Sequence, residues 1–269
     1  MKFRSTLLLI LSLLSNFAFA GKNINLANID ETMLIKLMSA QVDKDAGTSI
    51  KNVSAIFLGT PYKANRLIGS NEEKEQLVID LGNLDCFTYL DYVESLRKSD
   101  SILTFFENVI NTRYSSGQID YLSRKHFFSD WVSENAHNVN DVTSQMSPQV
   151  NSVTKYLNRK SNGETYIQGL DIRQREITYI PGTNINDAVI SKLQDGDYIG
   201  IYTNIDGLDV THTGIFIRGN HGPVLRHASS SSVNRKVVDS PFINYVKSKP
   251  GILVYRAHDR KNITVNLAP

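Results

Sequence analysis

The sequence has very little cysteine, with Cys86 as the single one among 269 residues. One cysteine cannot form a disulfide within the chain, so a protein of this length must be held together by a hydrophobic core. The apolar share of 41% is sufficient for such a core. Cys-x-x-Cys and His-x-Glu spacings are absent as well, and no third ligand has a convincing spacing from the histidines. We therefore expect neither a metal site nor a cofactor.

Net charge is also nearly absent, because 29 basic residues stand against 27 acidic ones. Two of the basic residues, Lys2 and Arg4, precede an apolar run over residues 7–14 and the small-x-small sequence of residues 18–20, which is typical of a cleaved secretory signal. Removal of residues 1–20 would leave the chain without net charge. That balance argues against a nucleic-acid binder.

The same segment indicates where the protein acts. Residues 7–14 form too short an apolar run to span a bilayer, and no cysteine follows the cleavage site to carry a lipid anchor. We expect a periplasmic or secreted protein with no integral membrane segment, in which residues 21–269 form a single domain. Nothing in the sequence indicates an obligate protein partner.

The residues that follow Cys86 have the spacing of a helix with one buried face. The apolar positions are Cys86, Tyr89, Leu90, Val93 and Leu96. The polar residues Asp91, Ser95 and Lys98 are predicted to lie away from that face. Glu94, four residues before Lys98, is predicted to form an exposed helical pair with it.

This pattern places Cys86 in the first turn of the helix, which Asn83 or Asp85 can cap. Unpaired amides and the positive end of the helix dipole favour a thiolate there and can also stabilise an oxyanion. The Asp85 carboxylate acts in the opposite direction, because a neighbouring negative charge raises the pKa of a thiol. The alternative is that Cys86 is a small buried apolar residue, a common role for an isolated cysteine.

The other patterns predict an α+β fold. Helices are expected over residues 30–40, 49–58, 101–111 and 186–193. Strands are expected over residues 77–81, 177–180, 198–203, 210–218, 224–228, 237–238 and 252–256. Close turns such as the one at residues 219–222 make the C-terminal strands an antiparallel meander.

Residues 114–163 differ in composition, being rich in Ser, Asn and Gln, and we predict a mostly helical insertion there. The insertion contains one aromatic group, formed by Phe127, Phe128 and Trp131. A small hydrophobic cluster explains these rings better than a platform for a ligand does.

Two histidines, His212 and His227, lie inside successive predicted strands. If the turn is centred on residues 220–221, His212 is opposite Ser229 and Gly214 is opposite His227, which makes the histidines diagonal neighbours on one face. A thiolate, an imidazole base and a polar group that orients the base are the minimum unit for cysteine acyl transfer. The alternative for each histidine is a structural residue satisfied by hydrogen bonds.

Five motifs together resemble the NlpC-type papain-like cell-wall hydrolases. They are Gly59-Thr60-Pro61-Tyr62, Asp85-Cys86 at a helix start, Asp195-Gly196-Asp197 before a strand, Thr211-His212-Thr213-Gly214-Ile215, and His227. The resemblance implies a papain-like fold in which N-terminal helices, including the cysteine helix, pack on an antiparallel sheet that carries the histidine and a third polar residue. This chain departs from the usual member in its longer interval between Tyr62 and Cys86 and in the insertion.

With these two departures, the chain resembles one branch of the superfamily, the N-acetylmuramoyl-L-alanine amidase-like family, formerly a domain of unknown function. The matching stretches are residues 57–62, 83–88, 123–131, 207–214 and 226–230. The resemblance implies hydrolysis of the amide between N-acetylmuramic acid and L-alanine in peptidoglycan fragments, including anhydro-muropeptides. It implies catalysis by the nucleophile Cys86, the base His212 and the orienting His227. The residues it implies for substrate binding are Tyr62, Asp85, Arg124, His126, Trp131, Asp209 and Ser229.

Two alternative functions are a stem-peptide endopeptidase and a cell-wall binding protein. An endopeptidase of the stem peptide would use the same fold and the same catalytic set, and only the family resemblance separates it from an amidase. A cell-wall binding protein without activity would have no need for the intact set of Cys86, His212 and His227. In all three cases the expected partner is peptidoglycan or a muropeptide.

Overall fold

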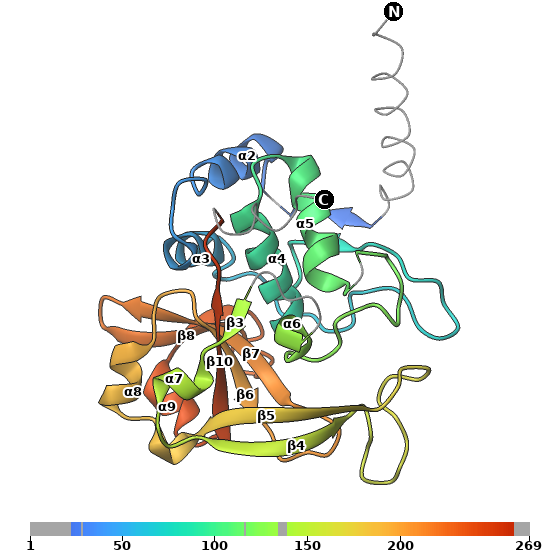
Figure 1. The fold of residues 1–269 in the computed structure, drawn as a ribbon. Coiled ribbons are helices and arrows are strands. Elements are labelled where there is room, and N and C mark those ends of the chain that lie inside the picture. The colour runs from blue at the N-terminus through green and yellow to red at the C-terminus, as the bar shows by residue number, and fades with distance from the viewer. Residues whose placement is uncertain (1–22, 28, 116, 134–138, 261–269) are drawn as a thin grey trace, which may run out of the picture.

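The structure is a computed structural model that describes residues 23–27, 29–115, 117–133 and 139–260 (Figure 1). The predicted secretory signal lies outside the described residues. Helices from the N-terminal half lie above an antiparallel sheet built mainly from the C-terminal half, as Figure 1 shows. This arrangement confirms the predicted α+β class. No helix in the described part of the chain is long and apolar enough to cross a membrane.

The N-terminal half contains four longer helices and a two-stranded parallel pair. The helices are α2 (Glu31–Ser39), α3 (Ala46–Ala55), α4 (Cys86–Lys98) and α5 (Ile102–Arg113), and the pair is β1 (Ile24–Asn25) with β2 (Ile79–Asp80). The helices predicted over residues 30–40 and 101–111 are confirmed. α3 begins earlier than predicted because Asp45 caps it, accepting a hydrogen bond from the Thr48 N–H at 2.8 Å.

The main sheet has eight strands among the described residues, all paired antiparallel. In sequence order they are β3 (Val139–Asp141), β4 (Asn151–Leu157), β5 (Arg173–Pro181), β6 (Tyr198–Tyr202), β7 (Val210–Gly219), β8 (Gly222–Ala228), β9 (Val237–Pro241) and β10 (Gly251–Ala257). Their spatial order is β4-β5-β10-β6-β7-β8-β9, and β3 pairs with the end of β10. The predicted meander is thus confirmed for β6 to β9, whereas β10 returns to the centre of the sheet.

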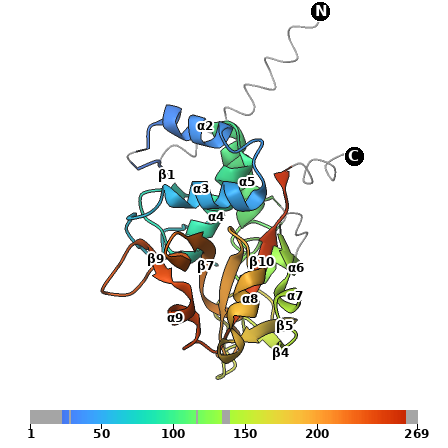
Figure 2. The same ribbon diagram turned by 90° about the vertical axis from the view of Figure 1, so that its left-hand side faces the viewer.

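Apolar side chains cover both faces of this sheet. One face packs against α4 and its neighbours and includes Tyr198, Ile215 and Leu253. The other packs against two short helices, α8 (Asp187–Lys192) and α9 (Phe242–Val246). Figure 2 shows α8 and α9 beside the strands, away from the group formed by α2 to α5.

α4 is buried on all sides, so the predicted exposed face is wrong. Asp91, Glu94, Ser95 and Lys98 are all at most 7% exposed. The cause is tertiary packing, because α2, α3 and α5 lie against the helix as well as the strands β7 and β8.

The charges on α4 are buried as pairs rather than as single ions. Glu94 accepts two hydrogen bonds of 2.6 Å from Arg97 and one of 2.6 Å from the hydroxyl of Tyr198 on β6, and it lies 3.4 Å from the Lys98 ammonium. Burial alone would raise the pKa of Glu94, but the Arg97 and Lys98 charges outweigh it and hold the pKa below its ordinary value. Glu94 is therefore ionised and tethers α4 to the sheet.

The prediction that residues 114–163 are mostly helical is also wrong. They contain two four-residue helices, α6 (Asp130–Ser133) and α7 (Thr143–Met146), and the strands β3 and β4. β4 pairs with β5 along its full length, from Asn151 opposite Tyr179 to Leu157 opposite Arg173. Its residues alternate between an exposed and a more buried side, the period of two that marks a strand.

We predict that Glu94→Ala lowers the free energy of unfolding by about 3–5 kcal/mol, because it leaves Arg97 buried without its carboxylate. Urea unfolding followed by circular dichroism measures the loss. The matched control is Glu164→Ala, which removes a carboxylate from the exposed pair with Lys160 and should change the unfolding midpoint little. Similar unfolding midpoints for the two variants would show that the buried ion pair of Glu94 stabilises the protein no more than the exposed pair of Glu164.

Candidate active site

Cys86 is the first residue of α4, and Asp85 caps the helix as predicted. Asp85 Oδ1 accepts hydrogen bonds from the N–H groups of Phe87 at 3.0 Å and Thr88 at 2.8 Å, and Thr88 Oγ1 accepts one from the Asp85 N–H at 3.1 Å. The carboxylate therefore occupies two of the amides that were expected to stabilise a thiolate or an oxyanion. Asp85 has a structural position at the helix start.

The Cys86 thiol has a pKa raised to about 11, first by burial and then by the negative charge of Asp85. The polar groups of Thr213 and the N–H of Cys86 act to lower this pKa but do not overcome burial and Asp85. The predicted preference for a thiolate is therefore wrong for the free protein, because burial and Asp85 outweigh the helix terminus. Cys86 is a neutral thiol at pH 7 and needs a base to react.

The histidines lie on neighbouring strands in the predicted register. Gly219 pairs with Gly222 and Ile215 with Arg226, as expected for a turn centred on residues 220–221. His212 Nε2 lies 2.7 Å from His227 Nδ1, with the rings nearly perpendicular. The predicted diagonal contact on one face is confirmed.

Gly214 makes the close approach of these strands possible. A Cβ atom at Gly214 would lie 2.7 Å from Leu225 Cδ1 and 3.0 Å from His227 Cβ. A larger residue at position 214 would therefore have to displace Leu225 or His227.

Both imidazoles are neutral at pH 7. Burial is the main reason that the pKa of His212 falls to about 3, and the charges of His227 and Lys249 add to it. Burial also lowers the pKa of His227 to about 4, against the opposing charge of Asp239. Since a neutral imidazole has one free lone pair, it can accept a proton from a neutral thiol.

The strand of His212 contacts the cysteine helix through the next residue. Thr213 Oγ1 donates a hydrogen bond of 2.8 Å to the Cys86 carbonyl oxygen. Thr213 is also among the groups that act to lower the pKa of the Cys86 thiol. Residues that are 127 positions apart in the sequence are therefore in contact, and His212 precedes Thr213 in the chain.

Two tyrosines lie close enough to Cys86 for a thiolate charge to raise their pKa values, after burial as the larger cause. Tyr62 is held by a hydrogen bond of 2.8 Å from its N–H to the Arg235 carbonyl, as its loop passes beside Leu84. The fold thus brings the Tyr62 loop beside the helix start that carries Cys86. Tyr62 can contact a substrate only because of this placement. Tyr245 on α9 has its ring centroid 4.9 Å from that of His227.

Sequence reasoning missed Tyr245, Thr213 and Ser240. Ser240 Oγ lies 3.0 Å from His227 Nε2. The prediction ended β9 at residue 238, so Ser240 fell outside the strand. In the observed register His227 pairs with Val238, which makes Ser240 the diagonal neighbour of His227. The diagonal argument that linked the two histidines would have found Ser240 had β9 been predicted to its full length.

Arg124 and His126, predicted to bind substrate, make contacts within the protein. The Arg124 guanidinium forms a two-point ion pair with the buried Glu75 and lies over the Tyr121 ring. His126 Nε2 is 2.8 Å from the Tyr121 carbonyl oxygen, and burial lowers the pKa of this histidine to about 4. These contacts fix the loop between α5 and α6.

Trp131 is only 4% exposed and packs edge-on against Tyr198, so its ring offers no open face to a sugar. The family resemblance implied substrate binding for Trp131, whereas the structure places the residue in the main core. Phe128 is in the same core, stacked on Tyr255. Of the three rings that were expected to form one small hydrophobic cluster, only Phe127 belongs to such a cluster, with Leu157 and Leu170.

Asp209 and Ser229 are also buried. Asp209 accepts 2.7 Å hydrogen bonds from the Ser129 N–H and the Val210 N–H, which connects the loop before α6 to the start of β7. The Ser229 N–H donates to the Lys236 carbonyl just beyond β8. Both residues hold the ends of the strands that carry the histidines.

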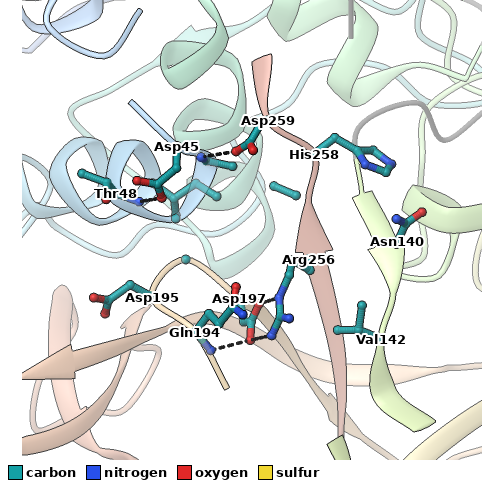
Figure 3. Close-up of a pocket in the computed structure, with 15 residues that line it drawn as sticks. Asp45, Thr48, Asn140, Val142, Gln194, Asp195, Asp197, Arg256, His258 and Asp259 are labelled. Carbon is teal, nitrogen blue, oxygen red and sulfur yellow. Dashed lines mark hydrogen bonds and ion pairs between the residues drawn. The ribbon is translucent and has the colours of Figure 1, made fainter. Parts of the chain in front are cut away.

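A pocket of about 640 Å³ lies elsewhere, between the start of α3, the turn before β6 and the end of β10 (Figure 3). Its carboxylates are already engaged: Asp197 pairs with Arg256, Asp195 with Lys51, and Asp259 accepts a hydrogen bond from the Ala46 N–H. It contains none of the catalytic candidates. Among the described residues, no group of three or more His, Cys, Asp or Glu side chains is arranged to hold a metal ion.

A family model described as N-acetylmuramoyl-L-alanine amidase-like matches residues 52–252, which include the cysteine, both histidines and Ser240. The chain belongs to this family. The resemblance found in the sequence motifs is thereby confirmed for the amidase-like family. No curated protein matches the chain.

Solved structures agree with the family assignment. An N-acetylmuramoyl-L-alanine amidase from Bacteroides uniformis is 29% identical, with a TM-score of 0.66 over 79% of this amidase-like chain and 99% of the other. Protein LPG0564 from Legionella pneumophila is 25% identical, with a TM-score of 0.71 over 85% and 94% of the two chains. A protein from Bacteroides fragilis named as a putative xylanase is 27% identical, with a TM-score of 0.62 over 76% and 99%.

We predict that acid destabilises this amidase-like protein partly through His227. In the folded protein the pKa of His227 is about 4, below the ordinary value of 6.5. The free energy of unfolding is therefore unaffected by this group above pH 6.5 and falls as the pH drops from 6.5 toward 4, by on the order of 2 kcal/mol. Urea unfolding at a series of pH values measures this loss. In His227→Asn, which does not titrate, the decrease over the same range should be smaller, and an equal decrease would contradict the assignment.

Proposed function

We propose that this protein is an exported cysteine amidase of the NlpC-type papain-like class. It hydrolyses the amide between N-acetylmuramic acid and L-alanine in peptidoglycan fragments, including anhydro-muropeptides. The observation that carries the proposal is a neutral, hydrogen-bonded histidine pair on the strand that contacts Cys86. Membership of the amidase-like family and the similarity to a solved amidase support the choice of bond. Export rests on the signal sequence predicted at residues 1–20.

The catalytic step begins with both partners neutral. Cys86 Sγ attacks the lactyl carbonyl carbon of the muramic acid as its proton passes to His212, so the thiolate exists only as the new bond forms. We assign the Cys86 N–H, at the first position of α4, to the stabilisation of negative charge at this point. His212 then gives the proton to the nitrogen of L-alanine, and the C–N bond breaks. Water, deprotonated by His212, attacks the remaining thioester and releases the sugar acid.

The side chains that flank the reaction are Tyr62 and Tyr245 rather than the buried Trp131. Both tyrosines are partly exposed and lie close to the Cys86 sulfur. Tyrosine rings offer an apolar face for a sugar together with a hydroxyl for hydrogen bonding. We assign Tyr62 and Tyr245 to contact with the substrate on this basis.

A glycoside hydrolase such as a xylanase requires two carboxyl groups on opposite sides of the scissile bond. Here the carboxylate beside the thiol is Asp85, which is committed to the Phe87 and Thr88 amides. The chemistry of this site therefore favours acyl transfer.

Cys86→Ala is expected to abolish hydrolysis while the protein stays folded, because the substitution removes the nucleophile and little volume. His212→Ala should be nearly as severe, with a loss of at least about 100-fold in kcat. His227→Ala should retain measurable activity, since water partly replaces an orienting group. Turnover of a purified muropeptide measures all three variants, and circular dichroism verifies their folding. Equal residual rates for the two histidine variants would contradict the assignment of base and orienting group.

Digestion of a disaccharide-tetrapeptide should release the intact disaccharide and a free peptide that begins with L-alanine. Mass spectrometry of the products identifies the bond directly. A sugar still joined to L-alanine and D-glutamate would instead establish a stem endopeptidase. The Cys86→Ala protein is the control, and xylan is the control substrate, from which no reducing sugar should appear.

A further inference from the structure

The hydrogen-bonded series that begins at His212 does not end at His227. His212 Nε2 lies 2.7 Å from His227 Nδ1, and His227 Nε2 lies 3.0 Å from Ser240 Oγ. The three residues are on the adjacent strands β7, β8 and β9, each diagonal to the next. His227, the central member of the series, is only 2% exposed. Ser240 is the last side chain of this series.

The number of hydrogens along the series restricts it to two arrangements. Each neutral imidazole carries one N–H, and one hydrogen lies between the two rings. In the first arrangement His212 donates from Nε2 to His227, and His227 donates from its own Nε2 to Ser240 Oγ. In the second, the Ser240 hydroxyl donates to His227, His227 donates from Nδ1 to His212, and His212 carries its hydrogen on Nδ1.

Only the first arrangement leaves His212 able to act as a base. Nε2 of His212 is occupied by His227 in both arrangements, so Nδ1 is the nitrogen that must receive the proton of Cys86. In the second arrangement Nδ1 already carries a hydrogen. Ser240 is at the end of the series away from His212. The direction of its hydrogen bond with His227 therefore decides whether His212 Nδ1 is free to accept a proton.

We propose that Ser240 is a positioning residue that accepts a hydrogen bond from His227 Nε2 and thereby holds both histidines in the tautomers that leave His212 Nδ1 free. This inference rests on the cysteine mechanism proposed above. When His212 takes the Cys86 proton and the S–C bond forms, the positive charge on His212 is stabilised by the lone pair of His227 Nδ1. The proton then leaves on the amine, and both rings return to their first tautomers.

Histidine ring ¹⁵N NMR tests the tautomers without any substrate. In the full-length protein labelled with ¹⁵N-histidine, His212 and His227 should both show a protonated Nε2 and an unprotonated Nδ1 at pH 7, with resonances assigned from His212→Gln and His227→Gln. Ser240→Ala should give a mixture of tautomers at both rings. Ser240→Thr, which keeps the hydroxyl, should restore the wild-type spectrum. A wild-type spectrum with hydrogen on Nδ1 of His227 would overturn the proposal even if Ser240→Ala did not fold.

Kinetics provide the second measurement. Ser240→Ala should lower kcat about fivefold, the effect of one neutral hydrogen bond, with KM unchanged, and Ser240→Thr should recover most of the loss. The matched control is Ser152→Ala, which removes another strand serine hydroxyl, 2.9 Å from Thr178 Oγ1, at the opposite edge of the sheet. Its kcat and its histidine spectrum should equal those of the wild type.

The two proposals fail in different ways. If Ser240→Ala left both the tautomers and kcat at wild-type values, Ser240 would have no positioning role while the amidase function stood. If the wild-type protein released no product from muropeptides but showed the expected tautomers, the amidase function would fail and the tautomer assignment would stand.

Discussion

The structure depends on the burial of charged residues along α4. A helix with Asp91, Glu94, Arg97 and Lys98 within two turns would normally keep them in water, yet here each is at most 7% exposed. Ion pairs offset the cost of removing these charges from water only when the geometry is complete. Glu94 meets this condition with partners on α4 itself and on β6. The helix that presents the thiol is thus held at a fixed depth against the sheet.

Fixed depth matters because the candidate catalytic residues come from separate parts of the chain. Cys86 begins α4, His212 lies on β7, His227 on β8 and Ser240 on β9. Positions along each strand are set by the antiparallel register, and the join to the helix is made by the Thr213 contact with Cys86. No carboxylate is part of this series of side chains, so burial keeps both imidazoles neutral instead of pairing them with a negative charge.

Local patterns in the sequence predicted much of this arrangement. The capped start of the cysteine helix, the hairpin register and the contact between the histidines follow from spacing rules that depend only on neighbouring residues. Features that depend on tertiary packing could not be read in the same way. α4 has no exposed face because neighbouring helices, including α2 and α5, cover it. Trp131 is a core residue because it packs against Tyr198. The thiol pKa likewise depends on burial, which spacing along one helix does not determine.

The position of β10 has a consequence for how the chain reaches this structure. β10 is the last strand in the described sequence but lies between β5 and β6, and β3 also pairs with it. Without residues 251–257 the sheet would divide into a β4–β5 ribbon and a β6–β9 meander with no strand between them. Contacts between segments this distant in sequence make folding slow, since loop closure must precede any gain from pairing. The two parts of the main sheet are therefore joined only when residues 251–257 pair with both β5 and β6.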